Sequence, residues 1–200
     1  MAELKDSYLT IAEPAEAIYK ERSSKFLTYA YPVESEEEIK LLLDALRKEY
    51  YDATHHCYAY RLGAQGEIYR ANDDGEPSGT AGKPILGQLL SANLTNCLVV
   101  VVRYFGGTKL GVSGLIQAYK ESTAEVIAVS NIIEKTVDRV VRVDFSYESM
   151  NGVMRIIKEM SPRIDEQVVD NICTMRLRIR ESEADQLIAK LLKVEGVSIS

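Results

Sequence analysis

An unbroken apolar run, Leu98-Val-Val-Val-Val102, constrains the fold of this 200-residue chain more than any other segment. β-Branched residues favour strands, and a strand that lacks an alternating polar side is typical of one buried on both faces of its sheet. The run is also far too short to span a bilayer. A glycine-rich stretch follows it directly, which predicts a loop that leads into a helix.

The rest of the chain alternates short strands and helices. A helix should open at Ser35-Glu-Glu-Glu38, because the Ser35 hydroxyl and the Glu38 carboxylate can form a capping box. Further helices are expected at 83–92, 113–130, 148–160 and 182–193. Expected strands are 8–12, 26–32, 55–62, 67–71, 94–104, 136–146, 164–170, 172–180 and 197–199. The inner helix faces should include Met150, Val153, Met154, Ile157, Leu187, Ile188, Leu191 and Leu192.

The composition of the sequence changes after about residue 132, because few glycines follow that point. The elements that follow have the order β-α-β-β-α-(β) of a ferredoxin-like split unit. We therefore expect an α+β protein of two domains, 1–133 and 134–200.

Charge and cysteine content favour a cytoplasmic protein. The net charge is −6, yet residues 55–120 carry six basic and four acidic side chains and form the one positive third. This is a mild indication of an anion-facing surface. The three cysteines, Cys57, Cys97 and Cys173, are expected to be buried reduced thiols. The N-terminus lacks a signal-peptide pattern, and no membrane association is expected.

Two segments, 73–84 and 103–114, hold seven of the twelve glycines, and each leads into a predicted helix. The first turn of a helix presents unpaired amides and a partial positive charge, and Lys83 and Lys109 add full charges. This predicts two adjoining sites for phosphates or carboxylates. The candidate binding residues are Asp74, Glu76, Ser78, Gly79, Thr80, Gly82, Lys83, Arg103, Tyr104, Gly106, Gly107, Thr108, Lys109, Gly111 and Gly114, with His56.

Other interpretations of these segments stay open. The glycines can simply serve tight turns, and carboxylates in such turns can satisfy loop amides rather than act as acids or bases. A nucleotide-hydrolysing P-loop is excluded, because that motif needs a glycine at position 77 and a hydroxyl residue at position 84, where this chain has proline.

Two further patterns carry weaker hypotheses. Adjacent residues of a strand point to opposite faces, so His55-His56-Cys57 cannot all face one metal ion, and no metal or cofactor is expected. One histidine should face the glycine-rich surface. In the C-terminal half, Arg176, Arg178 and Arg180 share one strand face. That face could bind RNA, although pairing with Asp165, Glu166 and Asp170 is the favoured interpretation.

The two glycine-rich segments, together with 56–60 and Lys20-Glu-Arg-Ser-Ser-Lys-Phe26, closely resemble the IMPACT family, also called YigZ or UPF0029. The resemblance covers about residues 15–130; Ser113 departs from it, since members usually have glycine there. It implies an N-terminal domain with the fold of ribosomal protein S5 domain 2 and a ferredoxin-like C-terminal domain of the DUF1949 type. It also implies a role near ribosomes or RNA and no firm enzymatic activity.

Three functional hypotheses follow. The first is a non-enzymatic, translation-associated regulator that binds RNA or the ribosome through residues 73–114, with Tyr104 and Tyr119 stacking on bases. The second is an enzyme acting on an anionic or peptide substrate, with Asp74 or Glu76 as the acid–base group. The third is a protein–protein adaptor that uses the acidic helix 36–49.

Overall fold

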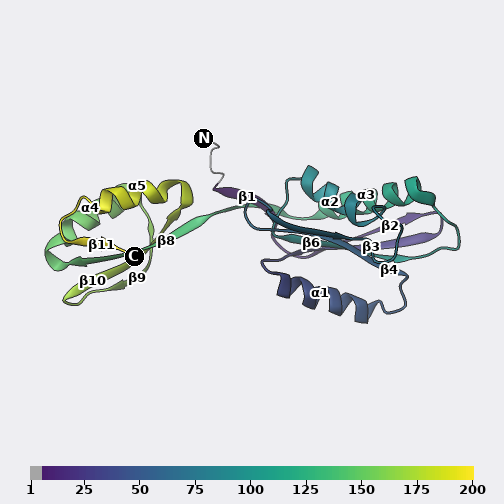
Figure 1. The fold of residues 1–200 in the computed structure, drawn as a ribbon, viewed down its shortest axis with the longest axis horizontal. Coiled ribbons are helices and arrows are strands. Elements are labelled where there is room, and N and C mark those ends of the chain that lie inside the picture. Colours follow the sequence, from purple (N-terminus) through teal and green to yellow (C-terminus); the bar gives the residue numbers. More distant parts are fainter. Residues whose placement is uncertain (1–5) are drawn as a thin grey trace. The chain divides into compact units, whose positions relative to one another are not determined.

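The computed structural model describes residues 6–200, which form two compact units (Figure 1). One unit spans 8–135, and the other spans 136–200 together with Asp6 and Ser7. Both units mix helices with strands, so the expected α+β class is confirmed. The boundary between Lys135 and Thr136 lies beside the expected cut near 134. Within residues 6–200, no helix is long and apolar enough to cross a membrane.

A five-stranded antiparallel sheet forms the centre of unit 8–135, and helices cover both of its faces (Figure 1). Two helices lie on one face and one helix on the other. The strand order is β2 (Ala15–Glu21), β3 (Ser24–Pro32), β6 (Cys97–Tyr104), β4 (His55–Leu62) and β5 (Ile68–Asn72). The pair on one face is α2 (Gly82–Ser91) and α3 (Gly111–Val129), and the single helix is α1 (Glu36–Glu49). A separate two-stranded sheet joins β1 (Ser7–Ile11) to β7 (Ile132–Thr136).

Strand β6 is buried on both faces, as its apolar run predicts. Val99 and Val101 belong to the core beneath α2 and α3, whereas Val100 and Val102 belong to the core beneath α1. The strand lies in the middle of the sheet, where a long apolar run removes the most apolar surface from water. It therefore brings the second glycine-rich segment, which follows at once, to one end of the sheet.

The start of α1 confirms the capping prediction. The Glu38 amide donates to Ser35 Oγ at 3.2 Å, and the Glu38 carboxylate accepts from the Glu34 amide at 2.7 Å. The Glu38 carboxylate thus bonds the amide of the residue before Ser35 rather than the amide of Ser35 itself. The Glu38 amide is one of those that the first turn of the helix leaves without an internal partner, and the Glu34 amide lies just before the helix.

The second unit has a ferredoxin-like sheet. Its elements are β8 (Asp138–Ser146), the 3-10 turn η1 (Tyr147–Ser149), α4 (Met150–Met160), β9 (Arg163–Val168), β10 (Ile172–Arg180), α5 (Glu181–Leu191) and β11 (Val197–Ile199). The sheet order is β11-β8-β10-β9, and every pair is antiparallel. The arginine face of β10 is paired in part as expected, since Arg178 bonds Asp165 at 2.7 Å and Arg176 lies 3.6 Å from Glu166. Arg180 and Asp170 form no ion pair within the described residues.

Strands β2 and β7 were not expected, and two residues were wrongly assigned to the core. Strand β2 was not expected, because its Ala, Glu and Lys residues are better helix formers; packing of Ala15, Ala17 and Tyr19 into the core decides its conformation. Met154 and Leu192 are 40% and 55% exposed, so both were wrongly placed in the core. The expectation that all three cysteines are buried and free is confirmed.

Candidate functional site: two glycine-rich loops around a buried ion pair

The first glycine-rich loop, residues 73–81, is folded around the carboxylate of Asp73. One oxygen of Asp73 accepts from the amides of Ala81 and Gly82 at 3.0 and 2.8 Å, and the other accepts from the Gly79 amide at 2.8 Å. No side chain adjacent to α2 caps it, because its capping residue is Ala81. Asp73 therefore provides, from nine residues upstream, the anion at the N-terminus of this helix.

Burial opposes the ionised form of Asp73, but the donors of Gly79, Gly82 and Ala81, with the charge of Lys83, outweigh burial and lower the pKa of the carboxyl. The group remains charged at neutral pH. This corrects the prediction of a ligand anion site at α2, because the protein's own carboxylate already occupies the amides of Gly79 and Gly82.

A buried ion pair joins the two glycine-rich segments. Arg103 Nη1 lies 2.5 Å from Glu76 Oε1, and the two side chains are 5% and 4% exposed. The Tyr119 hydroxyl donates to the same oxygen at 2.8 Å, and the Cys57 thiol donates to that hydroxyl at 3.3 Å. Glu76 Oε1 thus links a loop, a strand and α3. A buried pair of this kind is costly to break, because either partner alone would be an uncompensated charge.

The guanidinium of Arg103 is also held by aromatic rings and a serine. Its Cζ lies 5.5 Å from the ring centre of Phe26 and 5.7 Å from that of Phe105. Ser24 Oγ accepts from Arg103 Nη2 at 3.4 Å and from the Gly106 amide at 3.2 Å. A Cβ on Gly106 would lie 2.1 Å from the carbonyl carbon of Ser23, so only glycine permits this approach of two backbones.

The histidines take opposite faces, as alternation along β4 requires. His55 faces the ion pair: its Nδ1 lies 2.8 Å from the Asp74 carbonyl oxygen and its Nε2 lies 3.8 Å from Glu76 Oε2. His56 lies beside Tyr50 and Arg47 on the face of α1, where burial lowers its pKa. The expectation that His56 belongs to the glycine-rich surface is thus corrected to His55. Within residues 6–200, no cluster of three or more His, Cys, Asp or Glu side chains could hold a metal ion.

Both glycine-rich segments line one pocket of about 340 Å³, which we call the loop pocket. Phe105 and Val112 at its wall are 47% and 60% exposed. The N-terminus of α3 opens onto it, and no side chain among residues 6–200 accepts a hydrogen bond from its first amides, in contrast to α2. The lining residues are Glu76, Pro77, Arg103, Phe105, Lys109, Leu110, Gly111, Val112 and Leu115.

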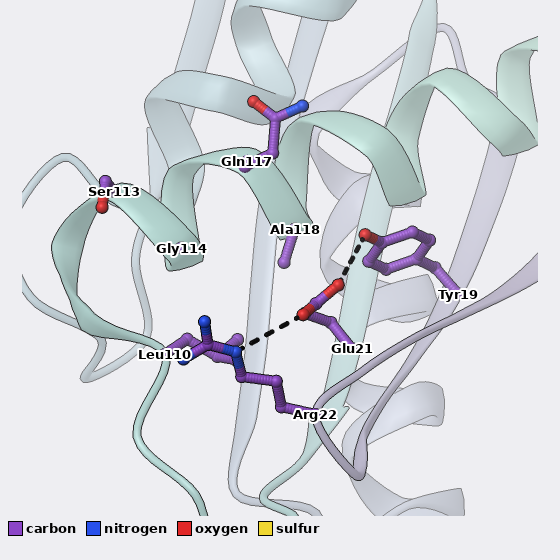
Figure 2. A pocket seen from close by; sticks show the side chains of 8 residues that line it. All are labelled: Tyr19, Glu21, Arg22, Leu110, Ser113, Gly114, Gln117 and Ala118. Atoms are coloured by element: carbon purple, nitrogen blue, oxygen red, sulfur yellow. Dashed lines mark hydrogen bonds and ion pairs between the residues drawn. The ribbon is translucent and has the colours of Figure 1, made fainter.

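A second pocket of about 240 Å³ lies on the other side of the first turn of α3 (Figure 2). Leu110 lines both pockets. Arg22 Nε lies 3.7 Å from Glu21 Oε1, and the Tyr19 hydroxyl donates to Glu21 Oε2 at 3.3 Å, so the one cation of this pocket faces a carboxylate (Figure 2). Arg22 and Ser23 both have positive φ, at 44° and 67°, in the tight turn between β2 and β3.

Some of the candidate binding residues are exposed on the glycine-rich surface, and others are not. Lys83 and Lys109 are exposed, and neither forms an ion pair in the described part of the chain. Tyr104 lies on the α1 face, donates to Asp52 at 2.8 Å, and has a pKa raised to about 12, first by burial and then by that carboxylate. Tyr119 is fully buried, so the expectation that it stacks on bases is wrong.

The remaining candidates fall into two groups. Ser78, Gly107 and Thr108 are exposed on the loops. Gly111, which begins α3, is exposed, and Gly114 in the first turn of this helix is half-buried. Thr80 is buried, and its hydroxyl donates to the Pro77 carbonyl at 2.7 Å, so it closes a turn. The expectation that carboxylates of this turn satisfy loop amides is confirmed for Asp73. Sequence reasoning missed His55, Phe105 and Val112 as residues of the site. The aromatic residue directly before Gly106 was a signal in the sequence that could have identified Phe105.

The fold and site define a class: a two-unit α+β protein with a glycine-rich pocket at one end of the first sheet. A family model for the Impact N-terminal domain matches residues 22–127, more than half of the chain. The IMPACT family member YvyE of Bacillus subtilis (strain 168) is 37% identical over 153 residues, which cover 76% of this chain and 70% of YvyE. The chain therefore belongs to the IMPACT family.

Two further comparisons extend over both units. The IMPACT family member YigZ of Escherichia coli (strain K12) is 29% identical over 188 residues, 93% of this chain and 92% of YigZ. The crystal structure of a hypothetical protein is similar with a TM-score of 0.72 and 28% identity, covering 98% of this chain and 97% of that one. The similarity thus extends well beyond the residues that the family model matches.

Proposed function

We propose that this protein is a non-enzymatic, translation-associated regulator that binds RNA or the ribosome through the glycine-rich surface of residues 73–114. Membership of the IMPACT family supports the link to translation, because the resemblance implies a role near ribosomes or RNA. One observation carries the binding surface: the N-terminus of α3 lacks a side-chain cap and lies two residues after the exposed Lys109. Phosphate oxygens are the ligands that such amides and a lysine favour.

The contacts of the Glu76 and Asp74 carboxylates favour binding over catalysis. Glu76 is held by Arg103 and Tyr119, and Asp74 Oδ2 accepts from the His56 amide at 2.6 Å. A general acid or base must exchange its proton with a substrate, and each of these carboxylates has one oxygen engaged by the protein itself. The buried, free cysteines support our placement of the protein in the reducing cytoplasm.

The proposal is tested by sedimentation with ribosomes and with free RNA across a salt series. With so few cations, binding should be weak and should fall with a slope of about −0.7 per phosphate contacted on a single strand. The variant Lys83→Glu/Lys109→Glu should lose binding. The matched control Lys40→Glu/Lys193→Glu makes the same change in net charge at exposed lysines elsewhere and should bind as the wild type does. Equal binding by both variants would overturn the proposal.

A protein partner is the second candidate, because one specific surface favours it. Leu41, close to the acidic first turn of α1, is 71% exposed, and Tyr51, just after the other end of this helix, is 84% exposed. Exposed aromatic and aliphatic side chains are typical anchors of protein interfaces. A partner that is captured by Lys83→Glu/Lys109→Glu but not by Leu41→Glu would favour this adaptor function over RNA binding.

A further inference from the structure

We propose that the loop pocket holds one unstacked nucleotide of the bound strand, with its base between Phe105 and Val112 and its phosphate at the start of α3. This inference rests on the proposed function and assigns it a specific subsite. The pocket, of about 340 Å³, falls within the size range of small-molecule sites. Its walls are apolar and its floor and rim are charged, and each of these features constrains the occupant.

The walls favour a flat ring. Phe105 is 47% exposed although Arg103 already lies near its ring, so part of the aromatic surface remains open to a ligand. Every base has a flat face, and stacking on an aromatic side chain needs no particular sequence. Val112 is 60% exposed and could cover an edge of such a ring, while the buried Leu115 lines the inner wall.

The floor favours a base over a hydrocarbon side chain. Glu76 Oε1 contacts both Arg103 and Tyr119. The other oxygen, Oε2, lies 3.8 Å from His55 Nε2, which is beyond hydrogen-bond range. Arg103 is 4% exposed, and its buried Nε has no hydrogen-bond partner within the described residues. An aliphatic occupant would cover Glu76 Oε2 and offer it no hydrogen-bond donor in return. The amino or ring N–H of a base can donate to the free carboxylate oxygen.

The rim supplies the anion site. Lys109 is exposed beside Gly111, and no side chain in the described part of the chain caps α3. At α2 the equivalent position is filled by Asp73, so the two helices differ in which anion they are built to hold. A phosphate at α3 would complement both the amides and the lysine. Its attached base would then be one sugar away, at the mouth of the pocket.

The first experiment fills the pocket without touching the charges. Val112→Trp places a large side chain at the pocket wall, and Ile116→Trp, on an exposed site one turn later that does not line the pocket, is the matched control. Binding of a fluorescein-labelled single-stranded RNA is followed by anisotropy. Val112→Trp should weaken binding roughly 5- to 100-fold, the loss expected for one stacked base, and Ile116→Trp should leave binding unchanged.

The second experiment separates the base from its phosphate. Guanosine 5′-monophosphate should shift the backbone amide resonances of Phe105, Gly111 and Val112 in the ¹⁵N-labelled full chain, and ribose 5-phosphate should shift only Gly111 and Val112. Identical shifts with both compounds would mean that only the phosphate binds, which would overturn the base pocket. Shifts produced by a leucine-rich peptide and not by the nucleotide would overturn it in favour of a protein ligand.

The two proposals can fail separately. Salt-sensitive RNA binding that is equally strong in Val112→Trp and Ile116→Trp would remove the base pocket and leave the proposed function standing. No RNA or ribosome binding by the wild type at low salt would remove the proposed function, and this subsite with it.

Discussion

Replacing Asp73 should show how the protein holds its first glycine-rich loop. This carboxylate accepts three backbone N–H bonds, from Gly79, Ala81 and Gly82, at 2.8 to 3.0 Å. Asp73→Ala removes all three at once and leaves the N-terminus of α2 without an anion. Asp73→Asn keeps the shape but loses the charge, and its amino group cannot accept from the third amide.

The size of the loss follows from these contacts. Losing a cap on one helix amide costs about 0.5–2 kcal/mol, and a hydrogen bond to a charged group contributes about 1.5–3 kcal/mol. Asp73 is only half-buried, and water can reach part of the site in the variant. We therefore expect Asp73→Ala to lower the free energy of unfolding by about 3–5 kcal/mol, and Asp73→Asn by about half of that.

Tyrosine fluorescence during urea unfolding is a suitable assay. Of the twelve tyrosines, only Tyr147 lies outside residues 8–135, so the signal reports on the unit that contains Asp73. Asp44→Ala is the control: this side chain is 61% exposed, its ion pair to Arg47 is 3.9 Å long, and its loss should cost less than about 0.5 kcal/mol.

The pH dependence adds a second test. Because the pKa of Asp73 is lowered in the folded protein, its stabilising effect is fully present above its unfolded-state pKa and is lost as the pH falls through the folded-state pKa. The stability gap between wild type and Asp73→Asn should be constant near pH 7 and should narrow below about pH 4. A loss under about 1 kcal/mol for Asp73→Ala, or a gap that does not change in acid, would refute this account of the loop.

Three further predictions concern the same unit. Glu76→Gln leaves a buried guanidinium without its counter-ion and should lower the free energy of unfolding by about 3–5 kcal/mol in urea titrations; a loss near zero would mean that the pair is not formed. Gly106→Ala should destabilise the protein and lower its melting temperature. Gly87→Ala, which has open space around it inside α2, should raise the free energy of unfolding by about 0.5–1 kcal/mol and with it the melting temperature. Shifts of the melting temperature in the same direction for both variants would contradict the structure. Burial raises the pKa of the Cys57 thiol, and it raises the pKa of the Cys97 thiol to about 12. Both thiols should therefore react with a disulfide reagent at pH 8 only as fast as the unit unfolds.

Local chemistry explains what could be predicted from the sequence. The capping box at Ser35 and the apolar run of β6 are signals within a few residues, and both elements formed as expected. The sequence predicted that carboxylates of the first loop can satisfy loop amides, but not that Asp73 serves the N-terminus of α2. A capping residue normally stands directly before its helix, and this one stands nine positions upstream. The choice between His55 and His56 likewise needed the side of the sheet on which α2 and α3 lie. Alternation along a strand shows that two neighbours differ, but not which one faces which helix.

The sequence by itself determined the two-unit α+β organisation, the membership of the IMPACT family and the two glycine-rich segments, because each is written in local pattern and motif. Only the tertiary structure decided which of the two helices that follow these segments, α2 or α3, has an N-terminus that is open to a ligand. Asp73 closes α2 through a folded loop, and Glu76 meets Arg103 across 27 positions of sequence. Both contacts depend on how the chain returns to itself across the sheet, and that return places the open end of α3 beside the loop pocket.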